Sequence, residues 1–94
     1  MKIERQEHGR KGAFFIEEDG EWIAELTYLK SAEDEITIDH TEVDDALEGR
    51  GIGKDLVGEA VEFARAGNLK IRATCPFARH VLEENADYAD VFVA

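Results

Sequence analysis

Twelve residues near the middle of the chain read Val43-Asp44-Asp45-Ala46-Leu47-Glu48-Gly49-Arg50-Gly51-Ile52-Gly53-Lys54. Before this turn, residues 35–43 read as a strand. After it, apolar residues recur at three- and four-residue spacing between Gly51 and Ala66, which predicts an amphipathic helix. The alternate glycines of the turn therefore lie where a strand ends and a helix begins.

The first half of the chain has the periodicity of β-strands. The pattern predicts strands over residues 2–8, 13–17, 21–29 and 35–43. Asp19-Gly20 predicts a type I′ hairpin turn, in which both central residues need positive φ. One face of the third strand is expected to be buried and to carry Trp22, Ala24, Leu26 and Tyr28.

The second half of the chain predicts a helix, a strand and a second helix. The first helix is expected to end with Gly67 as its cap, and a strand follows over residues 69–75. Pro76, the single proline, predicts the start of the second helix, and Tyr88, Val91 and Phe92 are expected to pack back as a short turn or strand. Together these elements predict one α+β domain over residues 1–94, with a mixed sheet and a right-handed crossover.

The charge balance narrows the classes of partner. The chain has 22 acidic and 11 basic side chains, a formal net charge of −11, and 14 of the acids lie within residues 1–47. This balance argues against binding to nucleic acids and anionic membranes and favours a cationic partner. With one cysteine, no secretory signal and no long apolar run, the chain is expected to be cytoplasmic. Its three histidines and Cys75 have no zinc-ligand spacing, so no metal site is expected.

The glycine-rich turn suits a phosphate group, because unpaired amides at a helix amino terminus favour anions. Two common nucleotide motifs nevertheless fail. A P-loop would need glycine in place of Glu48 and serine or threonine in place of Asp55. A dinucleotide-binding fingerprint would need glycine in place of Leu56 or Lys54.

The same turn resembles the acyl-CoA loop of the GNAT superfamily of N-acetyltransferases. That loop has arginine or glutamine, two residues, glycine, one residue, and glycine or alanine, and here it reads Glu48-Gly49-Arg50-Gly51-Ile52-Gly53. Glu48 departs from the pattern, which implies weaker binding of CoA without its loss, and Arg50 is expected to supply positive charge within the loop.

The resemblance extends over most of residues 13–92. His40-Thr41-Glu42-Val43, Cys75-Pro76-Phe77 and the segment 85–90 are similar to a short, YjdJ-type branch of this superfamily. That branch implies a reduced fold without the two N-terminal helices of longer members, and acetyl-CoA as co-substrate. By this resemblance the backbone of Val43 pairs with the pantetheine arm, and the pyrophosphate is held by Gly49, Arg50, Gly51, Ile52, Gly53 and Lys54.

Acyl transfer to an amine needs a proton acceptor and a donor for the departing thiolate. His40 and Glu42, two residues apart on the fourth strand, are candidates for the base. Cys75 is either a small core residue or a catalytic thiol at the amino end of a helix, whose dipole and free amides stabilise a thiolate. A thiol there could protonate the CoA thiolate or carry the acetyl group itself.

The sequence predicts an N-acetyltransferase that moves an acetyl group from acetyl-CoA to a primary amine, with a cationic acceptor favoured. Two alternatives stay open: a CoA-binding module with little catalysis, and an acidic protein-interaction domain without a cofactor. The sequence leaves open the identity of the acceptor, the route through Cys75 and the oligomeric state.

Overall fold

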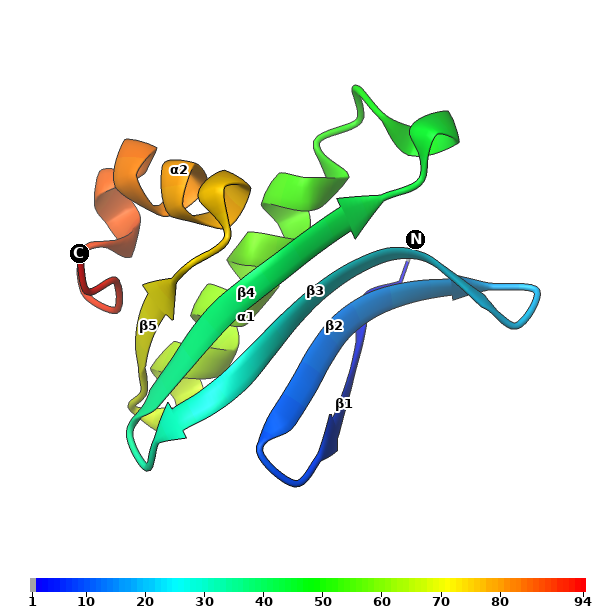
Figure 1. Cartoon of the computed structure of the whole chain (residues 1–94). Helices are drawn as coiled ribbons and strands as arrows, with labels where there is room; N and C mark the ends of the chain where they lie inside the picture. Colours follow the sequence, from blue (N-terminus) through cyan, green and yellow to red (C-terminus); the bar gives the residue numbers. More distant parts are fainter. Residues whose placement is uncertain (1) are drawn as a thin grey trace.

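The sheet is an antiparallel meander extended by one parallel strand, seen in a computed structural model that describes residues 2–94 (Figure 1). Its strands follow one another across the sheet as β1 (Glu4–His8), β2 (Lys11–Glu18), β3 (Glu21–Ala32), β4 (Glu35–Val43) and β5 (Lys70–Ala73). Strands β1 to β4 pair antiparallel, and β5 pairs parallel to β4. The predicted α+β mixed sheet is confirmed, and no helix lies before or between β1 and β4 in the described part of the chain.

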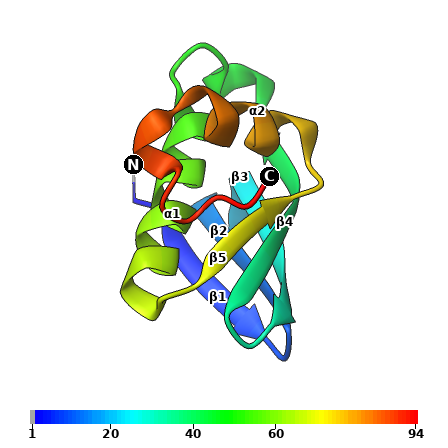
Figure 2. The same ribbon diagram turned by 90° about the vertical axis from the view of Figure 1, so that its left-hand side faces the viewer.

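Two helices follow the meander, α1 (Ile52–Gly67) and α2 (Pro76–Glu84), with short 3-10 turns η1 (Asp45–Leu47) and η2 (Ala86–Tyr88). The apolar side of α1 is buried against the sheet, and α2 lies next to the amino-terminal half of α1 (Figure 2). One apolar core joins β2 to β5 and both helices.

The cap of α1 differs from the prediction. Gly67 is the last helical residue, and the left-handed position that ends the helix belongs to Asn68, with φ of 55°. The Leu69 amide bonds the Ala64 carbonyl at 2.8 Å, which closes the helix end. Asparagine tolerates this conformation better than most residues, which is why glycine is not required there.

The predicted buried face of β3 is correct for Ala24, Leu26 and Tyr28 and wrong for Trp22. The β2–β3 register shifts by one residue between Ile16 and Glu17, a bulge that adds an extra residue to β3. Beyond the bulge, Trp22 stacks on Phe15 with ring centroids 4.1 Å apart, on the side of the sheet away from the helices. The Asp19-Gly20 turn has φ of 52° and 81° at its two residues, as predicted.

The strand β5, Lys70–Ala73, is shorter than the predicted 69–75, because residue 69 lies before it and residues 74 and 75 leave the sheet. On its other edge, the segment around Phe92 pairs with Ile71 in parallel: the Ile71 amide bonds the Val91 carbonyl and the Val93 amide bonds the Ile71 carbonyl, each at 2.8 Å. The prediction that Val91 and Phe92 pack back is confirmed, and the segment forms a single β-bridge to β5.

Candidate active site

The strands β4 and β5 part where their pairing ends, at Ile38 opposite Ala73. Beyond this point, the Ile38 carbonyl accepts hydrogen bonds from the amides of Thr74 and Cys75, at 2.9 and 3.2 Å. β4 continues along β3 to Val43, whereas the chain after β5 turns away into α2 (Figure 1). One flank of β4 is thereby left without a strand neighbour from residue 39 onward.

A bulge at Asp39 decides which side chains of β4 face the helices. Ile38 pairs with Tyr28 and His40 pairs with Thr27, so Asp39 is the extra residue. The Thr27 hydroxyl donates a hydrogen bond of 2.6 Å to the Asp39 carboxylate, at the bulge itself. Beyond it, Thr41 lies opposite the fully buried Leu26 and therefore faces the helix side.

The loop between β4 and α1 presents backbone amides rather than side chains. Gly49 and Gly51 have φ of 83° and 73°, a left-handed conformation that other L-residues adopt only with strain. Gly51 caps the amino end of α1, and the first bond within the helix runs from the Asp55 amide to the Gly51 carbonyl. The amides at positions 52–54 precede this bond and are free to bind an anion.

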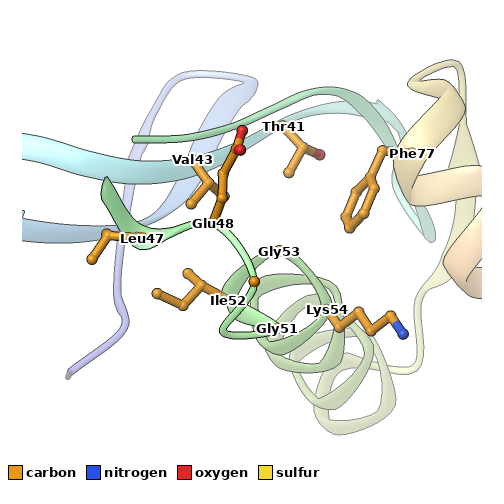
Figure 3. Close-up of a pocket in the computed structure, with 10 residues that line it drawn as sticks. Thr41, Val43, Leu47, Glu48, Gly51, Ile52, Gly53, Lys54 and Phe77 are labelled. Carbon is orange, nitrogen blue, oxygen red and sulfur yellow. The ribbon is translucent and has the colours of Figure 1, made fainter. Parts of the chain in front are cut away.

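A pocket of about 370 Å³ lies between this loop and β4 (Figure 3). It brings together six of the seven residues predicted to bind CoA: Val43, Gly49, Gly51, Ile52, Gly53 and Lys54. The seventh, Arg50, is exposed and does not line the pocket. The lining also includes three residues without a predicted role there, Thr41, Leu47 and Phe77.

The sequence did not predict a place in this pocket for Thr41, Leu47 or Phe77, for a different reason in each case. Thr41 lies one position from His40, and only the bulge at Asp39 turns it toward the pocket. Leu47 is an apolar residue within an acidic segment, and its burial could have been anticipated. Phe77 directly follows Pro76, so the sequence could predict its place in the first turn of α2. It could not predict the contact of Phe77 with α1.

Glu48 places a carboxylate in the pocket. In Figure 3 its side chain extends beside Val43 toward Thr41, whereas the Lys54 ammonium points away from it. A carboxylate here repels a phosphate group bound at the loop amides, so the departure at Glu48 affects the electrostatics of the pocket directly.

Cys75 is buried at the amino end of α2, with Pro76 as the first helical residue, as predicted. Its side chain makes no capping hydrogen bond to the first turn of the helix. Instead, the Cys75 Sγ lies 3.4 Å from the Thr41 Oγ1, at the parting of β4 and β5. The thiol therefore has a hydroxyl partner from the strand next to the pocket.

His40 and Glu42 share one face of β4 but lie on the side away from the pocket. The His40 Nε2 and the Glu42 Oε1 are 3.4 Å apart, and their cross-strand neighbours are Thr27 and Glu25. Their side chains are 52% and 71% exposed, so both can be reached by a molecule that approaches this face of the sheet. The structure does not bring them into contact with Cys75 or with the glycine loop.

Two further findings concern residues 2–94. Nowhere in this range do three or more His, Cys, Asp or Glu side chains gather closely enough to hold a metal ion. No helix within the same range has the length and apolar character needed to cross a membrane.

Comparisons with known proteins agree with this geometry. Residues 13–91 match the family model described as GCN5-related N-acetyl-transferase. A GCN5-like protein from Staphylococcus aureus, solved by NMR, is 43% identical with a TM-score of 0.74, covering 97% of this chain and 88% of the other. A ribosomal-protein-alanine N-acetyltransferase from Brucella melitensis shares the fold at 19% identity and a TM-score of 0.64, over 80% of this chain and 62% of that one.

Curated relatives give a match over part of their length. Protein NATD1 from Xenopus tropicalis is 37% identical over 62 residues, which are 66% of this chain and 57% of that protein. Human NATD1 is 40% identical over 50 residues, 53% of this chain and 44% of that protein. The chain thus spans about half the length of the curated relatives it matches.

Proposed function

The chain belongs to the GCN5-related N-acetyltransferase family, and from this membership we propose that it transfers the acetyl group of acetyl-CoA to a primary amine. The observation that carries the proposal is the pocket at the amino end of α1, which opens beside the parting of β4 and β5. A thiol with a hydroxyl partner lies at that parting.

The pocket fits the phosphate end of CoA. Gly49 and Gly51 expose the loop backbone, and the free amides at the start of α1 are available to bind an anion. The exposed backbone of β4 at Val43 is the proposed partner of the pantetheine arm. Arg50 and Lys54 add positive charge around the loop, which offsets part of the repulsion from Glu48.

The proposed chemistry divides between the two faces of the sheet. When bound, acetyl-CoA supplies an activated thioester. On the open face, His40 or Glu42 takes a proton from the attacking amine, and the new C–N bond forms as the C–S bond breaks. On the helix side, Cys75 gives a proton to the departing sulfur, or first takes the acetyl group and passes it to the amine.

A cationic acceptor is proposed from the charge of the open face. Asp39 and Glu25 lie there, next to the candidate bases His40 and Glu42, in the half of the chain that holds most of the acidic side chains. A polyamine, an amino sugar or a lysine side chain would be attracted to these carboxylates.

One specific observation favours a second candidate function. The candidate bases His40 and Glu42 contact neither Cys75 nor the glycine loop, which would suit a CoA-binding module with little catalysis. The open acceptor face, with no helix between β1 and β4 in the described residues, agrees with either function.

The proposal is tested by the thermal shift of the protein with acetyl-CoA. Acetyl-CoA is expected to raise the melting temperature, and Gly51→Ala is expected to remove the shift because it strains the loop. Gly9→Ala is the matched control: Gly9 also has a positive φ, 61°, but lies in the β1–β2 turn.

Three outcomes separate the candidate functions. Release of free CoA thiol with a panel of amines supports the transferase. A thermal shift without thiol release supports the CoA-binding module. If millimolar acetyl-CoA gives no shift, both are wrong, and a protein-interaction domain is favoured.

A further inference from the structure

We propose that Thr41 is a positioning residue for Cys75: its hydroxyl orients the thiol at the parting of β4 and β5 and stabilises the thiolate. The part of this proposal that concerns acetyl transfer rests on the proposed function. The contact itself does not, because it concerns two side chains of the chain alone.

The geometry of β4 brings Thr41 to this place. Without the bulge at Asp39, strict alternation from the buried Ile38 would turn His40 toward the helices and Thr41 away from them. The extra residue reverses this order, and the hydrogen bond from Thr27 to Asp39 lies at the point of reversal. The Thr41 side chain therefore both lines the pocket and contacts the thiol.

The Thr41 hydroxyl can act as a hydrogen-bond partner of the Cys75 sulfur in both protonation states of the thiol. A hydroxyl both donates and accepts, so Thr41 can accept from the neutral thiol and donate to the thiolate. The bond to the thiolate is charge-assisted and therefore the stronger of the two. Because the thiol makes no capping bond to the amides of α2, Thr41 is its hydrogen-bond partner among the described side chains.

The charged groups around this contact do not replace Thr41. On α2, the Arg79 guanidinium donates a hydrogen bond to the Ala73 carbonyl at 3.5 Å and forms an ion pair with Glu83 at 3.3 Å. The Glu83 carboxylate therefore partly neutralises its charge. On the pocket side, Glu48 opposes a thiolate, and Lys54 points away from Thr41 (Figure 3). The side chains that α1 buries toward the core are apolar.

The experiment measures how fast iodoacetamide alkylates the thiol, in the full chain and without acetyl-CoA. Cys75 is the single cysteine, so the rate reports this residue alone. Thr41→Val keeps the shape and removes the hydroxyl, whereas Thr41→Ser keeps the hydroxyl. Near pH 7, Thr41→Val is expected to slow alkylation about tenfold, and Thr41→Ser to react within about twofold of the wild type.

A second pH separates stabilisation of the thiolate from a structural effect. At about pH 10, where an ordinary thiol is ionised, the difference between Thr41→Val and the wild type is expected to disappear. The thiolate absorbance, read against Cys75→Ala, gives the same comparison without a reagent that must reach a buried sulfur.

Two kinds of result would overturn the proposal. Equal rates for Thr41→Val and the wild type near pH 7 would show that the hydroxyl has no effect on the thiol. Equal slowing of Thr41→Val at both pH values, or no recovery in Thr41→Ser, would show a packing effect instead. Neither result depends on acetyl transfer, so a failure of the proposed function is recognised separately, by the thermal shift.

Discussion

The ring of Phe77 lies directly against Gly53: a Cβ built on this glycine would be 2.7 Å from the Phe77 Cζ. The two residues belong to different helices, so the contact holds the first turn of α2 against the first turn of α1. Phe77 is 41% exposed and lines the pocket, which makes its ring the wall on the α2 side.

The first prediction concerns this contact. Gly58→Ala is expected to raise the free energy of unfolding by about 0.5–1 kcal/mol, because alanine favours a helix and its Cβ would meet only the Tyr88 hydroxyl at 3.4 Å. Gly53→Ala is expected to gain less, since the Phe77 ring must move. Urea unfolding measures both, and in a Phe77→Ala background the two gains should become similar. Equal gains in the wild-type background would contradict the close contact.

The second prediction concerns the charge in the pocket. Glu48→Gln is expected to lower the Kd for CoA about fivefold, since one charge about 4 Å from another is worth about 1 kcal/mol in water. Titration calorimetry measures the affinity, and the gain should shrink at high salt. Glu59→Gln, the same change on an exposed part of α1 outside this pocket, is the control. An unchanged Kd in Glu48→Gln would place this carboxylate away from the phosphates.

The third prediction concerns the thiol. Cys75→Ala is expected to abolish acetyl transfer and to leave CoA binding nearly unchanged, because Cys75 does not line the pocket. Turnover and calorimetry measure the two effects. Intact mass of the wild type after incubation with acetyl-CoA alone decides the route: an added acetyl group indicates a nucleophile, and no addition indicates a proton donor. Wild-type turnover in Cys75→Ala would remove the residue from the mechanism.

The fourth prediction concerns the open face of β4. Glu42→Gln is expected to lower kcat by roughly 10²-fold, the usual contribution of a general base, with little effect on CoA affinity. Glu25→Gln removes the same charge from the residue directly opposite on β3 and is expected to retain kcat. His40→Gln is assayed beside them, because the two side chains are in contact. If the loss occurs only in His40→Gln, the base is the imidazole.

The fifth prediction concerns stability at high pH. Burial and the hydrogen bond that the Tyr28 hydroxyl donates to Glu7, 2.6 Å long, raise the pKa of Tyr28 to about 12. The folded state favours the protonated phenol, so its stabilisation is complete below the ordinary pKa of about 10 and is lost as the pH rises toward 12. Chemical denaturation between these values should show wild-type stability falling.

Tyr28→Phe is the control for this fall. It is expected to be less stable near neutral pH by about 1–2 kcal/mol, because the hydrogen bonds to Glu7 and Arg5 are lost. Its stability should then vary less between pH 10 and 12 than that of the wild type. Parallel curves for the two proteins would mean that another group controls the alkaline transition.

Local signals in the sequence predicted several elements well. Asp19-Gly20 supplies the two positive φ values of its hairpin turn, and Pro76 begins α2 because proline suits the first helical position. The fourth strand was predicted with its observed bounds, Glu35–Val43. The glycine loop could be placed from the sequence because Gly49 and Gly51 need a backbone conformation that other residues avoid.

The bulges could not be predicted, and they decide which side chains reach the site. A bulge is one extra residue in a strand, and it is recognised by the pairing with the neighbouring strand. The sequence of one strand alone does not show this pairing. At Trp22 this reversed a predicted face, and at Asp39 it placed Thr41 beside Cys75 and His40 on the opposite face. The hydroxyl partner of the thiol therefore could not be predicted from the sequence.

The parallel pairing of β4 with β5 joins two segments that lie far apart in the sequence. The hairpins of the meander join residues that are close in sequence, whereas residues 35–38 meet residues 70–73 only after the whole of α1 has been bridged. Such distant pairings form slowly, because the entropy of a long loop is lost before any contact compensates for it. The contact between Thr41 and Cys75 requires that late pairing. During synthesis and refolding we therefore expect the sulfur to stay open to oxidants until β5 docks beside β4, so that a reducing environment should protect it.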